Sequence, residues 1–416
     1  MNVLYIYLNA LLYVITMIHI VHKNRDNYVN IYLFSIWFVG ALMGIVYVQS
    51  SLFYIFTKFH ILTIFPFLYL FILVMIFYKG ITVDKISKLE TCKSSIVYPL
   101  IVLISYSSYL PLFENIRQLI WGNIDFTNIN ETKESFISGD LESRYYMSWL
   151  GARLQSFSSY CYFISPILFF YYIIKYKKKR IIILLGLIAS ILNPILNSMV
   201  IGGRGVLIFT MLYFIANYLY FKELLPKAYN NFIKKTLYIL CTICIVFFII
   251  TTVYRFTADR YSDFMLSEWI VRYIGESMPN FNAEGWYFKD TTNGKSSFSY
   301  FTSIVGGDGS RNLEQLSKIS GIRMNVYYTL FGDLMIDFGR ISVFFIILLF
   351  YLISKKVKPS NGVIKLDKFI LFSLLFYTFI AGYFVWPMMN RMNGFWGAII
   401  VYFLIKITSN RCRESK

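Results

Sequence analysis

The chain has 416 residues, of which 57% are hydrophobic and 20% aromatic, while only 15% are charged. A soluble domain rarely exceeds about half apolar residues, and here the apolar residues form long uncharged blocks. Blocks of about 20 such residues cross a hydrocarbon core as helices. The composition therefore excludes an ordinary soluble protein. It predicts an all-α fold, a polytopic integral membrane bundle with about 11 transmembrane helices.

The spans are expected at 2–21, 29–50, 59–78, 94–113, 156–174, 181–201, 205–221, 236–254, 335–354, 369–388 and 392–406. Together they predict a single transmembrane domain over residues 1–416. Two segments between spans are long enough to fold outside the bilayer, and both fall on the same side. Residues 255–340 form the large loop and residues 114–153 form the smaller one.

The net charge of +18 divides unevenly between the two predicted sides. The loops of one side carry 24 Lys and Arg against 6 Asp and Glu, whereas the other side carries 16 of each. Cytoplasmic loops of membrane proteins are enriched in basic residues. The basic side is therefore expected in the cytoplasm and both long loops outside. The charge is a topology signal, so nucleic acid is not expected as a partner.

The basic residue types also differ between the sides. The cytoplasmic side has 20 Lys and 4 Arg, whereas the outer side has 5 Lys and 11 Arg. Arginine presents a planar fork that binds phosphate or carboxylate through two hydrogen bonds, and lysine does not. An arginine-rich outer side with no net charge indicates Arg–carboxylate pairs together with an anionic ligand. The alternative is that these arginines only brace the long loop.

Three of these arginines are expected at the outer boundary of the membrane. Arg204 is the one charge in residues 181–221 and lies in the stretch GGRG, where glycines permit a tight turn between two helices. Only 14 uncharged residues follow Arg340 before the next lysine, fewer than the roughly 20 that a span needs. The same holds after Arg391. We expect the three guanidinium groups to ring the outer mouth of the bundle.

Asp337 precedes Arg340 by three residues, so the two would share a helix face. Ionisable residues at membrane depth face a polar cavity or one another. The spacing predicts an Asp337–Arg340 pair, which could serve a ligand or could be purely structural.

The large loop has two parts of different composition. Residues 258–278 carry apolar side chains at helical spacing, which predicts an amphipathic helix on the membrane surface or over the bundle. Residues 276–309 are rich in Gly, Asn, Ser and aromatic residues. Aromatic rings stack on sugars and amides bind hydroxyls, so this part could be a glycan-binding loop; the alternative is an ordinary solvated loop.

Several chemical signatures are missing from the sequence. It has no glycine-rich nucleotide loop and no Gly-x-Ser-x-Gly elbow. No cluster of His, Cys and Asp offers enough ligands at metal spacing, so neither a metal nor a cofactor is expected. Charged residues are also missing from the centres of the spans, where an ion-coupled transporter would place them.

Three short stretches carry a family resemblance: GGRG (202–205), YIGESMPNFN (273–282) and RMNVYYTLFGDLMIDFGRISVF (323–344). Their order, with one dominant outer loop, resembles the oligosaccharide repeat-unit polymerases of O-antigen and capsule, the Wzy-type family. The resemblance implies a GT-C-like, metal-independent glycosyltransferase of the bacterial cytoplasmic membrane. Such an enzyme moves the growing glycan from undecaprenyl diphosphate onto the outer sugar of a new lipid-linked unit.

The resemblance also implies roles for individual residues. Arginines at the outer boundary would hold the diphosphate of the donor and stabilise the charge that develops as it leaves. The expected substrate-binding residues are Arg204, Arg340, Arg391, Arg323, Arg272, Tyr327 and Asn282. A carboxylate could deprotonate the attacking hydroxyl, and the candidates are Glu276, Asp337 and Asp333.

Three alternatives stay open: a ligase, a flippase or transporter, and a non-catalytic membrane scaffold. An O-antigen ligase has a similar shape, but the resemblance implies a functional histidine in its large outer loop, and residues 255–340 contain none. A flippase or transporter of lipid-linked oligosaccharide would lack so large a loop and would carry charges along an internal cavity. The expected partners are the undecaprenyl-diphosphate-linked oligosaccharide, the lipid bilayer and a regulator of chain length.

Overall fold

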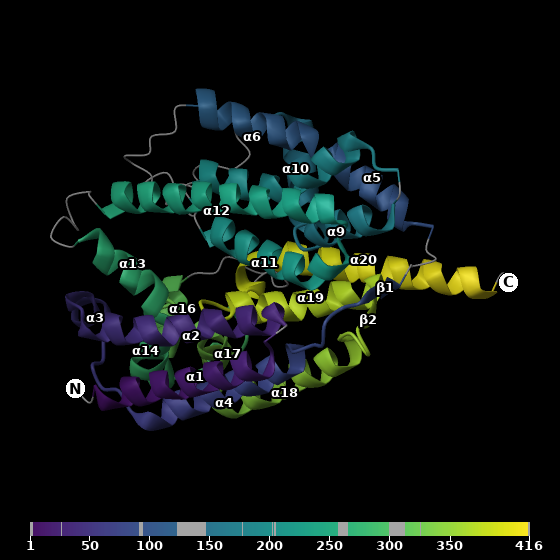
Figure 1. Ribbon diagram of the computed structural model, residues 1–416. Coiled ribbons are helices and arrows are strands. Elements are labelled where there is room, and N and C mark those ends of the chain that lie inside the picture. The colour runs from purple at the N-terminus through teal and green to yellow at the C-terminus, as the bar shows by residue number, and fades with distance from the viewer. Residues whose placement is uncertain are drawn as a thin grey trace. The chain divides into compact units, whose positions relative to one another are not determined.

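The computed structural model describes residues 3–25, 27–90, 95–122, 147–176, 178–201, 203, 205–256, 265–298, 313–324 and 326–414. Over these residues the chain is mostly helical, and its two strands span three residues each (Figure 1). Eight described helices are long and apolar enough to cross a membrane, or nine if the bent pair Trp149–Tyr160 and Ile164–Lys175 is one span. A mostly helical chain with several candidate spans is therefore confirmed, whereas the count of about 11 spans stays a prediction.

The described chain divides into two compact units, each assembled from segments far apart in the sequence. The first unit contains residues 1–84, 264–358 and 375–392, and the second contains 85–263, 359–374 and 393–416. The prediction of one domain over 1–416 did not include this division.

The first unit is built from long apolar helices and several short ones. Its elements are α1 (Leu4–Lys23), α2 (Tyr28–Gln49), α3 (Ser51–Phe56), α4 (Ile64–Ile81), α13 (Leu266–Gly275), α14 (Ser277–Ala283), η2 (Gly285–Tyr287), α16 (Leu313–Ser320), α17 (Thr329–Phe338), α18 (Arg340–Val357), the end of α19 (Leu366–Ala381) and the start of α20 (Met388–Glu414). Helices α1, α2 and α4 pack on one another, α18 packs on α4, and α13 packs on α2.

Aromatic side chains fill the core of the first unit around Trp37 of α2. The indole N–H of Trp37 donates to the carbonyl of Phe379 at 3.1 Å, so its one polar group is paired inside the core. The rings of Phe331, Phe379 and Tyr383 lie 5.5 to 5.6 Å from the Trp37 ring, centroid to centroid. This cluster ties α2 to α17 and to the end of α19.

A glycine contact brings α13 directly against α2. A Cβ atom on Gly275 would lie 2.4 Å from the carbonyl oxygen of Met43, which is closer than real Cβ atoms come to other atoms. On the facing helix, a Cβ on Gly44 would lie 3.5 Å from the carbonyl oxygen of Gly275. The backbones therefore touch at this crossing. The contact fixes where Glu276, the next residue after α13, lies relative to α2.

The span expected at 335–354 is interrupted by a change of helix at Gly339. Helix α17 ends at Phe338, Gly339 has a φ of +86°, and α18 begins at Arg340. A positive φ is open to glycine but strained for other residues, so this glycine terminates α17. Asp337 and Arg340 consequently belong to different helices, and neither α18 nor the 16-residue α19 is among the eight candidate spans.

The second unit centres on α10. Its elements are β1 (Lys88–Glu90), α5 (Val97–Ser107), α6 (Tyr109–Trp121), α8 (Trp149–Tyr160), α9 (Ile164–Lys175), α10 (Ile181–Val200), α11 (Gly205–Phe221), η1 (Lys222–Leu224), α12 (Lys227–Phe256), β2 (Val363–Lys365), the start of α19 and most of α20. Helix α10 packs on α5, α6, α9 and α11. Strands β1 and β2 pair in parallel, with Leu89 opposite Ile364.

The predicted hairpin around the GGRG stretch has the expected helix boundaries. Helix α10 ends at Val200 and α11 begins at Gly205. The amide of Gly203 donates to the carbonyl of Ser198 at 2.7 Å, and the Ser198 hydroxyl donates to the Gly203 carbonyl at 2.8 Å. These two bonds close the turn, as the glycine-rich sequence predicts.

Candidate functional site

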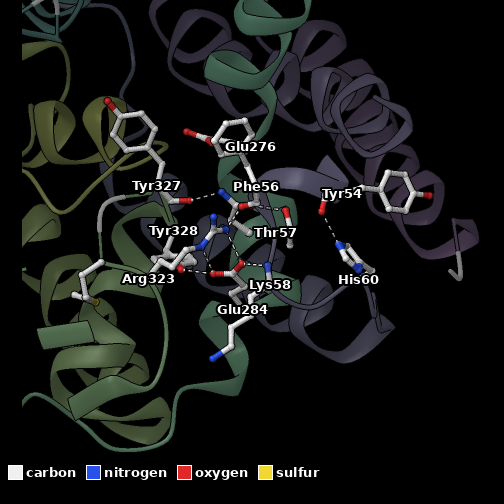
Figure 2. A network of polar contacts seen from close by, with 12 residues as sticks. Tyr54, Phe56, Thr57, Lys58, His60, Glu276, Glu284, Arg323, Tyr327 and Tyr328 are labelled. Atoms are coloured by element: carbon white, nitrogen blue, oxygen red, sulfur yellow. Dashed lines mark hydrogen bonds and ion pairs between the residues drawn. The ribbon is translucent and has the colours of Figure 1, made fainter. Parts of the chain in front are cut away.

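Several of the polar residues that the sequence analysis singled out lie together in the first unit, around the short segment that follows α3. Residues 56–63 lead from α3 to α4, and they contact two distant stretches of the large loop, 276–284 and 323–328 (Figure 2). Here the contacts span more than 200 positions, so residues near 60 and near 280 share one site.

An ion pair between Arg323 and Glu284 forms the centre of this region. Nη2 of Arg323 lies 2.6 Å from Oε1 of Glu284, and Nε lies 3.3 Å from Oε2, so the guanidinium holds both carboxylate oxygens. The Tyr328 hydroxyl donates to Oε2 at 2.8 Å, and the Lys58 amide donates to Oε1. Glu284 is fully buried, and four donors offset the cost of burying its charge.

Tyr328 stays protonated in this setting. Burial raises the pKa of its hydroxyl well above the ordinary value, and the neighbouring Glu284 carboxylate raises it further. A phenol that keeps its proton remains a hydrogen-bond donor to the carboxylate. Tyr328 therefore acts as a fixed part of the Glu284 cradle.

A second ion pair, between Arg272 and Glu276, links the end of α13 to the start of α14. Nε of Arg272 lies 2.9 Å from Oε2 of Glu276. The Arg272 guanidinium also lies over the Phe56 ring, 3.7 Å from its centroid, and 5.3 Å from the Trp269 ring. The Glu276 side chain is 6% exposed and that of Arg272 17%, so the arginine is the member of the pair that reaches solvent.

Burial raises the pKa of Glu276 above its ordinary value. The Arg272 and Arg323 charges and a hydrogen bond from Asn280 oppose the shift without cancelling it. The carboxylate is thus poorly compensated compared with that of Glu284. A raised carboxyl pKa in a polar cluster is typical of functional sites, although structural networks show it too.

The two arginines meet at Phe56. Arg272 lies over the ring of Phe56, and Nη2 of Arg323 donates to its backbone carbonyl. Among the described residues, neither Nη atom of Arg272 and no Nη1 proton of Arg323 has a hydrogen-bond partner. The arrangement therefore offers an anion two guanidinium groups, each oriented by a buried glutamate and each with N–H groups to spare.

Asp337, a predicted base, lies instead in a closed cradle. Its carboxylate accepts hydrogen bonds from the Thr292 hydroxyl, the Ser296 amide at 3.3 Å, the Ser297 amide at 2.7 Å and the Ser297 hydroxyl. The residue is fully buried. Because four donors already occupy its oxygens, Asp337 fastens residues 292–297 to α17.

Arg340 does not pair with Asp337, although their spacing in the sequence predicts such a pair. It donates to the Trp286 carbonyl, and its guanidinium lies 4.9 Å from the Trp286 ring centroid and 5.1 Å from that of Phe288. The break at Gly339 separates the two side chains by ending one helix between them. Arg340 is exposed and stays a candidate ligand for an anion.

Two more predicted residues are occupied by backbone contacts. Asp333 is buried, and its Oδ2 accepts the Trp386 amide at 2.7 Å. The Asn282 amide accepts from the Thr63 N–H at 3.0 Å and donates to the Thr63 carbonyl at 2.7 Å. Both halves of the Asn282 amide are thus used in joining α14 to the segment before α4.

Tyr327 lies beside the ion pairs but through different contacts. Its backbone carbonyl accepts the Asn280 amide at 3.4 Å. Its ring packs edge-on against Tyr273 and Phe384, with centroids 5.7 and 5.6 Å away. A role for Tyr327 in binding the substrate stays a prediction.

The remaining two arginines cannot be placed in the site. Arg204 lies outside the described residues. Arg391 belongs to helix α20, but its side chain is not described. The expected ring of Arg204, Arg340 and Arg391 therefore stays a prediction.

Sequence reasoning missed Glu284 and the segment at Phe56 and Lys58. A signal for Glu284 was present, because it is the one charged residue between Glu276 and Lys289. A lone carboxylate in such a stretch indicates a buried partner of opposite charge. No pattern in residues 56–63 indicates their contact with the large loop.

The described residues contain no group of three or more His, Cys, Asp and Glu side chains that could hold a metal ion. Comparison of the whole chain with protein-family models, with curated proteins and with solved structures found no significant match.

Proposed function

We propose that the chain is a membrane-bound glycosyltransferase that polymerises lipid-linked oligosaccharide repeat units. The donor is a glycan on undecaprenyl diphosphate, and the acceptor is the outer sugar of a new lipid-linked unit. The fold is GT-C-like, the membrane is the bacterial cytoplasmic membrane, and the large loop faces outward. One observation carries the proposal: Arg272 and Arg323 converge on Phe56, each oriented by a buried glutamate.

The arginine pair suits a diphosphate leaving group. In the transfer step, the bond between the anomeric carbon and the phosphate oxygen breaks, and the electron pair leaves with the diphosphate. The acceptor hydroxyl oxygen bonds to the anomeric carbon. Fixed guanidinium groups stabilise the developing negative charge because they need no reorganisation at that moment. Their bidentate geometry fits phosphate oxygens.

Glu284 and Asp337 are better suited to holding the site in shape than to taking the proton of the attacking hydroxyl. Glu284 and Asp337 each accept four hydrogen bonds and are fully buried. Glu276 faces Arg272 rather than open solvent. We assign the proton of the attacking hydroxyl to an oxygen of the departing diphosphate, which gains negative charge as the glycosidic bond breaks. The step then balances without a separate base.

The test is the glycan profile of cells that lack the protein and are complemented with variants. Arg272→Lys keeps the charge but loses the flat guanidinium that stacks on Phe56, so long-chain glycan should fall about 100-fold, equivalent to ~2.7 kcal/mol. Arg323→Lys should have a similar effect. The matched control is Arg153→Lys, an arginine stacked on Trp149 in the second unit, which should leave the chains at full length.

The same profile separates polymerase from ligase. A single repeat unit on the final acceptor, at normal protein levels, supports the proposal. A bare acceptor with stored lipid-linked polymer indicates a ligase. Unchanged chains in both site variants contradict a role of this arginine pair in either reaction.

A further inference from the structure

The two glutamates of the site differ in how their charge is compensated. Glu284 receives four hydrogen bonds, two of them from Arg323. Glu276 is paired with one atom of Arg272, its Nε, and has Asn280 beside it. Both carboxylates are buried, at 5% exposure for Glu276 and 0% for Glu284. Equal burial with fewer donors leaves Glu276 as the carboxylate that can exchange its charge for a proton.

The groups around Glu276 come from several elements. Arg272 of α13 is its ion-pair partner, and the charge of Arg323 also acts to lower the pKa of Glu276. Two neutral phenols, Tyr47 of α2 and Tyr383 after α19, lie close enough to interact with its charge. The ionisation of Glu276 therefore depends on the two arginines that the proposed diphosphate would use.

Arg272 divides its hydrogen-bonding capacity between protein and solvent. Its Nε is occupied by Glu276 and one face of its guanidinium by the Phe56 ring. Its two Nη atoms have no partner among the described residues, and 17% of the side chain is exposed. An anion can thus bind the Nη edge while Glu276 keeps its place on Nε.

An anion in that position would share its cation with Glu276. Two negative charges would then lie on one guanidinium in a largely buried site, where repulsion is poorly screened. The repulsion is relieved if Glu276 takes a proton. We propose that Arg272 is the entry point for a phosphate-ester anion and that binding of this anion is coupled to uptake of one proton by Glu276. The identity of the anion as a diphosphate diester rests on the proposed function.

The coupling has a defined sign. Because the protonated form of Glu276 is compatible with the bound anion, the anion binds more tightly as the pH falls. Where free protein has an ionised Glu276 and the complex a protonated one, the dissociation constant rises about tenfold per pH unit. Below the pKa of Glu276 in the free protein the dependence disappears. When the product diphosphate leaves, Glu276 releases the proton that it took up, and the site returns to its starting state.

Calorimetry on the purified full chain tests the coupling. The probe is P1,P2-dimethyl diphosphate, whose own charge does not change between roughly pH 5 and 8. Binding heats are measured in two buffers of different ionisation enthalpy, which yields the number of protons taken up. We expect up to one proton per anion and a matching rise of the dissociation constant with pH.

Variants assign the proton to Glu276. Glu276→Gln keeps an acceptor for Arg272 but cannot ionise, so the anion should bind tightly at every pH without proton uptake. Glu284→Gln, in the fixed pair, should retain the uptake if it folds. The wild-type measurement stands even if neither variant folds.

Three results would overturn the inference: no binding of the probe at any pH, binding without proton uptake, or an unchanged pH dependence in Glu276→Gln. Each is independent of the glycan profile. Cells whose glycan is unaffected by loss of the protein would refute the proposed function while leaving proton-coupled anion binding at Arg272 intact.

Discussion

The pairs Arg323–Glu284 and Arg272–Glu276 use the same residue types in the same unit, yet they have different properties. The first is bidentate and its carboxylate has two further donors, Tyr328 and Lys58. The second has one short contact, and burial raises the pKa of its carboxyl group. The number of donors around a buried carboxylate, rather than the presence of a cation, decides its role. With many donors it stays ionised and holds the structure together, and with few it can take up a proton.

Removal of the Glu284 carboxylate should have the largest effect on stability. Glu284→Ala leaves Arg323 partly buried without its counter-charge, and it also frees the Tyr328 hydroxyl and Lys58 amide. We expect a loss of about 3–5 kcal/mol, seen as a lower melting temperature in detergent. The matched control is Glu314→Ala, which removes a salt bridge to Lys318 whose side chains are 78% and 74% exposed. That change should leave the melting temperature nearly unchanged, because solvent screens an exposed ion pair. Equal losses of stability in the two variants would contradict a structural role for the Glu284 carboxylate.

Asp337 extends the comparison to a carboxylate that pairs with none of the arginines that the structure describes. Asp337→Ala frees four donors of residues 292–297, two of them backbone amides. We expect a loss of about 2–3 kcal/mol, because hydrogen bonds to a charged group are among the stronger ones. Hydrogen exchange should rise at residues 292–298 first. Unchanged exchange there would show that the cradle does not hold this loop.

Glu276→Gln should give the smallest change and the opposite sign. Since the pKa of Glu276 is raised on folding, the folded chain binds more protons than the unfolded chain between the ordinary and raised values. Stability of the wild-type protein therefore falls as the pH rises through the raised pKa. The glutamine variant lacks this loss, so its melting temperature should exceed that of wild type increasingly as the pH increases. A constant difference across the pH range would contradict a shifted Glu276.

Much of the helical framework could be predicted from the sequence. The boundaries near 181–201 and 205–221 follow from uncharged runs and a glycine-rich turn, and α10 and α11 match them. Of the amphipathic stretch 258–278, residues 258–264 lie outside the described residues, and the remainder contains α13, with Trp269 buried. The single span expected at 335–354 is interrupted at Gly339 for a local reason. An apolar run does not show where a glycine adopts a positive φ.

The site itself was only partly predictable. Arg272 and Arg323 were expected to bind the substrate and Glu276 to act as a base, and the structure brings these three side chains together. Their arrangement depends on contacts such as that of Asn282 with Thr63, which are 219 positions apart. Asn282 was expected among the substrate-binding residues. Helix α14 is wholly buried instead, and its amides satisfy protein backbone.

Transfer activity of the purified protein in lipid vesicles is the most direct test of the proposed function. The vesicles are loaded with one lipid-diphosphate-linked repeat unit and sampled over time. Wild-type protein should produce a ladder of longer lipid-linked glycans and release undecaprenyl diphosphate, and Arg272→Lys should slow ladder formation about 100-fold with normal folding. Repeat units that stay single with correctly folded wild-type protein, or a ladder unaffected by Arg272→Lys, would contradict it.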